Sequence, residues 1–296
     1  MLFGALEAGG TKMVCAVVDE KGNILKEQSF PTKSPEETIS ELIEYFKNEK
    51  IDALGIACFG PIDLNRNSKT YGYITSTPKE GWSNVDIVGE FQSKLDIPVG
   101  FDTDVNGSAL GEHTYGCGRD VDNLVYITIG TGIGIGVISE GKLLHGAMHP
   151  EGGHIMLTKQ PDDNYEGKCP YHKNCFEGLC SGPAIEERWG QKAEELKDNE
   201  EVWELEADYI AKALVSYTMI LSPQRIILGG GVMHQEQLFP IIRKKFTEYV
   251  NGYIKNEYVD DPEKYIVCQS LNDKQGILGA AKLGQMELQI LRRFNV

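Results

Sequence analysis

The sequence predicts an α/β protein made of two related domains, and three observations support this class. Runs of apolar and β-branched residues alternate with amphipathic segments of helical spacing, as in sheets covered by helices. Two glycine-rich turns, at residues 7–12 and 130–136, each join two strand-like runs, so the second half begins as the first does. The length of 296 residues is sufficient for two hydrophobic cores. We therefore expect one domain of residues 1–116 plus 277–296 and a second domain of residues 117–276.

Composition excludes several classes of protein. An apolar content of 41% is that of a globular chain, and the net charge of −15 argues against a nucleic-acid partner, which needs a basic surface. No apolar run reaches the length of about 18 residues that a membrane span needs, so we expect no membrane partner. No signal peptide is apparent before the first strand, and four of the seven cysteines are widely scattered. We therefore expect reduced thiols and a cytoplasmic location.

Three strand-like runs open the chain and form an expected antiparallel meander, at residues 3–6, 13–18 and 24–30. The first turn reads Gly-Gly-Thr-Lys at residues 9–12. Its context is not that of a P-loop, which opens a helix, because a strand follows here. The glycines still let backbone N–H groups approach an anion, while Thr11 and Lys12 add a hydroxyl and a positive charge. The turn therefore predicts a phosphate contact, with an ordinary glycine hairpin as the alternative.

A capped helix and a buried strand come next. Ser34, Pro35 and Glu37 are typical of a helix start, and apolar residues at helical spacing follow. A strand at residues 53–59 is expected to end at Gly60-Pro61. The loop at residues 70–84 carries Trp82 and is expected near a ligand, although loop packing alone would also explain the tryptophan. A further helix is expected at residues 87–95.

The strand expected at residues 97–101 leads directly into Asp102-Thr103-Asp104-Val105-Asn106, and a small-residue helix is expected at 107–112. Ligands of α/β sheets gather at the carboxyl ends of strands, so Asp104 is well placed to accept a proton from a hydroxyl nucleophile. The alternative is that Asp102 or Asp104 only caps the helix.

The second half repeats the plan, with strands expected at residues 123–129 and 133–139 around the second glycine turn. Two such turns at equivalent places suggest that duplicated domains grip a polyphosphate from both sides. Three glycines at 229–231 follow a buried strand and would permit close approach by a planar ring such as adenine; a simple tight turn is the alternative. The tail at 288–296 has no assignment, and the remaining elements are helices at 183–197, 200–222, 237–253 and 276–287 and strands at 225–228 and 266–269.

Four potential metal ligands lie between residues 154 and 175. Cys169, His172 and Cys175 are three residues apart, and His154 precedes them across a polar turn. Two thiolates and two imidazoles suit tetrahedral zinc, and four protein ligands make the site structural. The metal would then hold the flanking Glu151 and Glu177 as substrate contacts. Unrelated cysteines and histidines are the alternative.

In order and spacing these motifs resemble the sugar kinases of the ROK family, within the larger group of actin-like ATPases that includes hexokinase. The resemblance covers essentially the whole chain, and residues 4–12 are most similar to the zinc-containing bacterial fructokinases, with Glu7 where glucokinases generally have Asp. It implies a two-lobed fold of duplicated ribonuclease H-like domains. The matching motifs are the segments 9–12, 103–106, 130–136, 151–154, 169–175 and 228–231.

The resemblance implies ATP-dependent phosphorylation of fructose on its primary hydroxyl, giving fructose 6-phosphate, with Asp104 as the general base. Mg²⁺ would bridge the phosphates, with Glu7 holding one of its waters, and closure of the lobes would exclude water. The implied sugar contacts are Gly60, Pro61, Asn106, Glu151, His154 and Glu177. The implied ATP contacts are Gly9, Gly10, Thr11, Lys12, Thr131 and Gly132 at the phosphates and Gly230 and Gly231 at the adenine.

The substrate and the assembly state have alternatives. A glucokinase or an N-acetyl-amino-sugar kinase of the same family is one rival, and a sugar-sensing protein without turnover is another. Many family members have three cysteines at the zinc site, whereas His172 takes a ligand position here. Repressors of the family carry a DNA-binding segment before the first strand, and we expect none in this chain. The family habit implies a homodimer.

Overall fold

The computed structural model describes residues 1–77 and 79–294 and confirms the α/β class. By their contacts the residues form two compact units. The first unit comprises residues 1–119, 145–149 and 270–296, and the second comprises residues 120–144 and 150–269. Residues 117–119, 145–149 and 270–276 thus fall in the first unit, whereas the sequence pattern assigns them to the second domain. Among the described residues, no helix is both long and apolar enough to cross a membrane.

The first unit contains a five-stranded sheet in the order β3-β2-β1-β4-β7. The meander is confirmed, because β1 and β3 both pair antiparallel with β2. The other two strands run parallel to β1. Two short strands, β5 (Tyr73–Ile74) and β6 (Val85–Asp86), form a separate pair. The strands of the large sheet are β1 (Leu2–Ala8), β2 (Lys12–Asp19), β3 (Ile24–Pro31), β4 (Ala53–Cys58) and β7 (Val99–Thr103).

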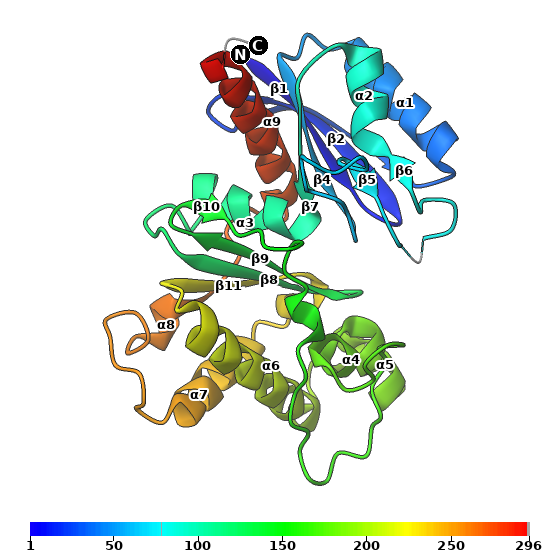
Figure 1. Ribbon diagram of the computed structural model, residues 1–296. Helices are drawn as coiled ribbons and strands as arrows, with labels where there is room; N and C mark the ends of the chain where they lie inside the picture. Colours follow the sequence, from blue (N-terminus) through cyan, green and yellow to red (C-terminus); the bar gives the residue numbers. More distant parts are fainter. Residues whose placement is uncertain (78, 295–296) are drawn as a thin grey trace. The chain divides into compact units, whose positions relative to one another are not determined.

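Helices cover both faces of this sheet (Figure 1). Alternation along β1 divides the core: Phe3 and Ala5 pack with α9 (Gln275–Phe294), whereas Leu6 and Ala8 face the other core, which includes α1 (Pro35–Lys47) and α2 (Ile87–Leu95). The remaining helix, α3 (Asp104–Tyr115), packs against α9. A Cβ on Gly55 of β4 would lie 1.7 Å from the Ala280 carbonyl oxygen. Glycine there allows direct backbone contact between β4 and α9.

The second unit repeats the sheet order as β10-β9-β8-β11-β12, and the pairing directions also repeat. Its strands are β8 (Leu124–Ile129), β9 (Ile133–Ser139), β10 (Lys142–Leu143), β11 (Arg225–Gly229) and β12 (Ile266–Cys268). Its helices are α4 (Phe176–Cys180), α5 (Gly182–Trp189), α6 (Glu200–Leu221), α7 (Leu238–Val250) and α8 (Pro262–Tyr265), with 3₁₀ turns η1 (Gly152–His154), η2 (Ala193–Leu196) and η3 (Gly231–His234). The duplicated architecture predicted from the two glycine turns is confirmed.

Several local predictions need correction. The helix expected at 183–197 ends at Trp189, because Gly190 adopts a left-handed φ of 72° and caps it. The helix α4 was not predicted, since its five residues are too few to show a period. The unassigned tail continues α9 as far as Phe294, while residues 295–296 lie outside the described residues. The strand expected at 97–101 is found at Val99–Thr103, and the helix after it begins at Asp104.

Trp82 is a core residue. Its side chain is fully buried against the core that contains α1 and α2, and its indole N–H donates to the Lys33 carbonyl oxygen at 2.9 Å. Loop packing therefore accounts for this tryptophan, while the expectation that the loop at residues 70–84 lies near a ligand stays a prediction.

Candidate active site and metal centre

Asp104 lies where β7 ends and α3 begins, in the first unit. Thr103 caps the helix, since its hydroxyl oxygen accepts the Asn106 N–H at 3.1 Å. The alternative that Asp102 or Asp104 is the cap is therefore wrong. One oxygen of Asp104 accepts the Val105 N–H at 2.8 Å, and burial raises the pKa of Asp104 to about 6. A carboxyl group with this pKa is largely ionised at pH 7 and can take a proton.

Asn106 presents a buried acceptor one turn along α3. Its side-chain N–H donates to Asp102 Oδ1 at 2.7 Å, which fixes the orientation of the amide. The amide oxygen, Oδ1, is buried and has no hydrogen-bond partner among the described residues. A buried polar atom of this kind is suited to a ligand hydroxyl, because leaving it unpaired costs free energy.

Glu7, on β1, adds a second carboxyl group near Asp104. Burial first, and then the charge of Asp104, raise the pKa of Glu7 to about 7, while Lys12 and Lys274 act in the opposite direction. Two neighbouring carboxyl groups at one edge of a sheet favour a divalent cation or a proton between them. The two carboxyl groups therefore offer oxygen ligands of the kind that suits the Mg²⁺ implied by the family resemblance.

The first glycine turn joins β1 to β2. The Gly9 N–H donates to the Lys12 carbonyl oxygen at 3.1 Å, and the Thr32 hydroxyl donates to the Gly9 carbonyl oxygen at 2.7 Å. Gly10 is open, since a Cβ there would meet no atom within 4 Å, and the side chains of Thr11 and Lys12 are exposed. Hydrogen bonds at Gly9 therefore hold the base of the turn, while its tip and the charged Lys12 side chain remain accessible.

A pocket of about 500 Å³ lies within the first unit, beside Gly60-Pro61. Its walls are formed by residues 61–65, Thr75 and residues 145–148. Thr75 closes one side, since its N–H donates to the Pro61 carbonyl oxygen at 2.8 Å. No sequence pattern points to residues 145–148, because they continue the run toward the zinc stretch and no period sets them apart.

The second glycine turn joins β8 to β9 in the second unit. The Gly130 N–H donates to the Gly132 carbonyl oxygen at 2.9 Å, and Thr131 at its tip is exposed. Glu177 of α4 accepts the Ile133 N–H at 3.0 Å. A predicted sugar contact therefore supports the base of the predicted phosphate turn, an arrangement that the spacing of these residues does not reveal.

The three glycines after β11 are not equivalent. Gly230 has a φ of 88°, and a Cβ there would lie 2.5 Å from the Ile129 carbonyl oxygen. A Cβ on Gly231 would meet no atom within 4 Å. A Cβ on Gly130 would lie 3.9 Å from the Gly231 nitrogen, so the second glycine turn and Gly231 are neighbours. Gly231 thus offers an open backbone surface next to a predicted phosphate contact.

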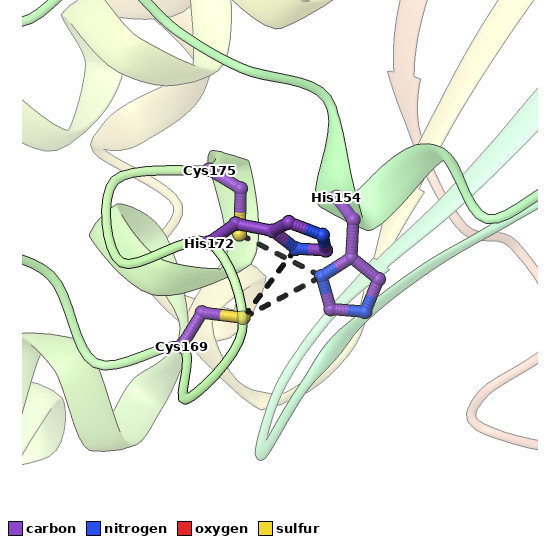
Figure 2. A group of neighbouring side chains, drawn as sticks. All are labelled: His154, Cys169, His172 and Cys175. Atoms are coloured by element: carbon purple, nitrogen blue, oxygen red, sulfur yellow. Dashed lines mark hydrogen bonds between the residues drawn. The ribbon is translucent and has the colours of Figure 1, made fainter.

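The four predicted zinc ligands come together in the second unit (Figure 2). Their ligand atoms all lie within 4.8 Å of one another. His154 Nδ1 is 3.8 Å from Cys169 Sγ and 3.6 Å from Cys175 Sγ, and His172 Nδ1 is 3.8 Å from Cys169 Sγ. Zn–S bonds of about 2.3 Å and Zn–N bonds of 2.0–2.1 Å at tetrahedral angles give S···N edges of about 3.5–3.6 Å. The donor set and its spacing therefore fit tetrahedral zinc.

The cluster is connected to the second glycine turn. Cys175 is the N-cap of α4 and accepts the Gly178 N–H at 3.4 Å, which is an outer-shell contact typical of a metal-bound thiolate. Glu177 lies in the first turn of this helix and holds Ile133. Glu151 precedes the η1 turn that carries His154 and is exposed. Glu177 is therefore held in a helix that begins at a residue of the cluster.

The predicted site residues are divided between the two units. Within the first unit lie Gly9, Gly10, Thr11, Lys12, Gly60, Pro61, Asp104 and Asn106. Within the second lie Thr131, Gly132, Glu151, His154, Cys169, His172, Cys175, Glu177, Gly230 and Gly231. Sequence reasoning gave Asp102 only a possible capping role and gave residues 145–149 no role, because their contacts depend on tertiary structure.

The chain is similar to known proteins over nearly its whole length. The model of the ROK family matches residues 3–287. A protein of Bacillus subtilis (strain 168) is 52% identical over 289 residues, which are 97% of this chain and 97% of that protein. A fructokinase of Pediococcus pentosaceus is 46% identical over 289 residues, covering 98% of this chain and 99% of its own. The crystal structure of the ROK hexokinase from Thermus thermophilus matches with a TM-score of 0.83 at 25% identity, covering 98% of this chain and 100% of that one. The chain belongs to the ROK family and has its duplicated, actin-like ATPase fold.

Proposed function

We propose that the chain is an ATP-dependent fructokinase that phosphorylates the primary hydroxyl of fructose to give fructose 6-phosphate. Asp104 carries this proposal, because it supplies a partly buried carboxyl group with a pKa of about 6 at the carboxyl edge of a sheet. Relatives named fructokinase, from Pediococcus pentosaceus and Zymomonas mobilis, are 46% and 42% identical over nearly the whole chain. Relatives named glucokinase, such as that of Streptomyces coelicolor, are 27% identical. Fructose is therefore the favoured hexose.

In the proposed reaction, Asp104 accepts the proton of the primary hydroxyl as that oxygen attacks the γ-phosphorus of ATP. The new O–P bond forms while the bond between the γ-phosphorus and the β,γ-bridging oxygen breaks, and ADP leaves. A base whose pKa lies near the working pH combines an ionised ground state with a useful affinity for the proton. Asn106 Oδ1 would accept a hydrogen bond from another hydroxyl of the sugar and so orient it.

The ATP contacts follow from the two glycine turns. Thr11 and Lys12 of the first unit and Thr131 and Gly132 of the second offer hydroxyls, backbone N–H groups and one positive charge to the phosphates. Gly231 offers the open backbone on which adenine would lie. Glu7 is the residue that would hold a water of Mg²⁺. Its pKa is about 7 in the absence of a metal, and a nearby cation would lower that pKa and so favour the ionised form. Bound Mg²⁺ neutralises the charge that develops on the phosphates.

We further propose that His154, Cys169, His172 and Cys175 hold a structural zinc ion. The donor set and the S···N distances of 3.6–3.8 Å support it. The ion would staple the loop whose helix carries Glu177, and Glu177 in turn supports the Gly132–Ile133 backbone. Removal of the metal is therefore expected to affect folding and nucleotide binding together. A cytoplasmic homodimer is the proposed working state of the enzyme, with thiols kept reduced as is usual in that compartment.

The test is an ATP-consumption assay on purified protein with Mg²⁺ and a panel of fructose, glucose, mannose and N-acetylated amino sugars. Sugar-dependent ADP formation that is greatest with fructose, together with fructose 6-phosphate as the product, would support the proposal. Greater turnover with glucose or an N-acetylated amino sugar would reassign the substrate within the family. Sugar binding without ADP formation would indicate a sensor.

A further inference from the structure

Residues 145–149, His-Gly-Ala-Met-His, form a short strap in the first unit, although the chain before and after them belongs to the second. A histidine attaches each end. His145 Nε2 lies 2.8 Å from Asp102 Oδ2, and His149 Nε2 accepts the Ile62 N–H at 3.4 Å. Between them the Gly146 N–H donates to the Met148 carbonyl oxygen at 3.0 Å, so the strap makes a tight turn.

Asp102 is the anchor for this strap. It is 2% exposed, and its oxygens take part in three hydrogen bonds. Oδ1 accepts the Thr103 N–H at 2.8 Å and the Asn106 side-chain N–H at 2.7 Å, while Oδ2 is paired with His145. A buried carboxylate requires such partners because it has lost its hydration. The hydrogen bond to Asp102 raises the pKa of His145, against the opposite effect of burial.

The same carboxylate therefore connects the strap to the two residues that the proposed reaction uses. Its Oδ1 holds the Asn106 amide in the orientation that leaves Asn106 Oδ1 as a buried acceptor. It also holds the Thr103 N–H, immediately before Asp104. A charge-assisted bond from His145 keeps Asp102 in this arrangement, since such bonds are stronger than neutral ones. The influence of His145 on Asn106 passes through Asp102, since His145 pairs with Oδ2 and Asn106 with Oδ1 of the same carboxylate.

His145 also belongs to the wall of the 500 Å³ pocket. The strap residues 145–148 form one part of this wall, and residues 61–65 with Thr75 form another. The residues that line the wall include the polar Asp63, Asn65 and Thr75 and the apolar Ile62 and Leu64. A polyhydroxylated ring with polar edges and apolar C–H faces suits such a lining.

We propose that His145 is a positioning residue for hexose recognition: paired with Asp102, it fixes the pocket wall and, through the shared carboxylate, the Asn106 oxygen that accepts a sugar hydroxyl. This inference rests on the proposed function, because it assigns the pocket to the non-reacting end of the hexose. His145 thus sets affinity for the sugar more than the rate of phosphoryl transfer.

The test compares His145→Gln with His145→Phe in the full-length protein. Glutamine places an amide N–H at about the reach of histidine Nε2, whereas phenylalanine keeps the ring and removes the donor. Fructose binding is measured by calorimetry without nucleotide, and KM and kcat are measured for fructose and ATP. We expect His145→Phe to raise the fructose dissociation constant and KM about tenfold or more, with a smaller fall in kcat and an unchanged KM for ATP. His145→Gln should stay within about threefold of the wild type.

Asp102→Asn completes a double-mutant cycle with His145→Phe. If the two residues act as a pair, the effects on fructose affinity should be clearly less than additive. The NMR titration of His145 should show a pKa above the usual 6.5 in the wild type, and a lower value in Asp102→Asn. These measurements report on the interaction between His145 and Asp102. If the histidine ring only filled space, neither the coupling nor the dependence of the His145 pKa on Asp102 would be expected.

The outcomes separate this inference from the proposed function. Wild-type protein that binds fructose but forms no ADP would refute the kinase proposal, and the dissociation constants of the variants would still decide the role of His145. An active wild type whose fructose affinity is the same in His145→Phe would overturn the inference and leave the kinase proposal intact. Equal losses in the Gln and Phe variants would also overturn it, since the donor would not then matter. Wild-type protein without affinity for any hexose would overturn both.

Discussion

The two units share one order of strands but prepare their polar ends by different means. In the first unit the carboxyl ends of β1 and β7 carry ionisable side chains. Burial raises the pKa of Asp104, which follows β7, to about 6 and that of Glu7, in β1, to about 7. In the second unit the corresponding region is built from backbone, with Gly130 and Gly230 shaped by hydrogen bonds and a left-handed φ. A four-ligand cluster supports it from α4 and η1.

This difference separates chemistry from shape. A carboxylate whose pKa is raised by desolvation reduces stability at neutral pH but gives a base of suitable strength, so the first unit gains reactivity and loses some stability. Glycine turns fix backbone positions without any ionisable side chain, and the four-ligand cluster fixes the loop that supports the second of these turns. Changes in the first unit should therefore alter turnover more than folding, and changes in the second unit should alter folding and nucleotide binding more than the chemical step.

The largest expected effect is that of Asp104→Asn. Loss of the general base should lower kcat by about 10²–10⁴-fold, as measured by fructose-dependent ADP formation. The same variant should be more stable at pH 7, by about 1–3 kcal/mol in denaturant unfolding, because a carboxyl group with a raised pKa costs free energy when ionised. Higher stability combined with lost turnover would show that the ionised Asp104 carboxylate serves the reaction and lowers the free energy of unfolding.

Asp96→Asn is the matched control for this variant. Asp96 is exposed at the C-cap of α2 with a φ of 54°, a conformation that asparagine tolerates well. The control should leave both kcat and stability unchanged. Near-normal turnover in Asp104→Asn would remove Asp104 from the role of base, and a loss of stability there would show that its carboxylate is a structural partner instead.

Turnover and stability should respond to pH in opposite directions. The ionised form of Asp104 is the active one, so kcat/KM should be constant above its pKa of about 6 and fall about tenfold per unit below it. The raised pKa means that the folded state binds a proton more readily than the unfolded chain. Its contribution to stability is therefore fully present below the unfolded pKa, about 3.9, and is lost as the pH rises through 6.

Rate measurements and thermal unfolding between pH 5 and pH 8 test this prediction. Because Glu7 and Asp104 interact, the acid limb reports the pair rather than either residue alone. A rate that is flat down to pH 5 would contradict the assignment of a base with a raised pKa.

Cys169→Ala tests the second unit. Loss of one ligand should release the metal and destabilise the fold by about 4 kcal/mol or more, the scale of lost metal sites. The KM values for fructose and ATP should rise several-fold, because α4 carries Glu177 and Glu177 holds the Ile133 N–H. The chemical step itself, measured in single turnovers at saturating substrates, should change less. Thermal unfolding, metal analysis and steady-state kinetics provide the readouts.

Cys268→Ala makes the same change at an exposed cysteine in β12, outside the cluster. It should match the wild type in metal content and in melting temperature. If Cys169→Ala retains one zinc ion per chain, or if its melting temperature and KM values are unaltered, the metal proposal and its link to the glycine turn both fail.

The features predictable from sequence were those encoded by local pattern. The alternation of Ala5 and Leu6 gave strands with two buried faces, and Ser34 gave a helix start whose hydroxyl oxygen indeed accepts the Glu37 N–H. The spacing of the cysteines and histidines gave a cluster that the fold brings together. Each of these signals lies within a short stretch of chain, where chemistry and spacing are both visible.

Pairs that are distant in sequence could not be predicted in this way. Asp102 and His145 are 43 residues apart, and Ile133 and Glu177 are 44 apart, so no period or motif connects them. Gly190 ended a helix that the amphipathic pattern would have continued, since a single glycine is often tolerated within a helix. The missed features therefore share one cause, which is that tertiary contacts or backbone conformation decided them.

The smallest effects are expected at the glycines after β11, where two neighbours separate folding from binding. Gly230→Ala should destabilise the protein by about 1–3 kcal/mol, because its φ of 88° is unfavourable for alanine and its Cβ would lie 2.5 Å from the Ile129 carbonyl oxygen. Gly231→Ala should leave the melting temperature nearly unchanged, because a Cβ there meets no atom within 4 Å.

The two variants should then differ in how they affect ATP. A methyl group on Gly231 would occupy the open backbone proposed for adenine, so the KM for ATP should rise several-fold in a fully folded protein, with the KM for fructose unchanged. In Gly230→Ala any loss of affinity should accompany the loss of stability. An unchanged KM for ATP in Gly231→Ala would move the adenine contact elsewhere in the second unit, because that variant alters the surface and nothing beneath it.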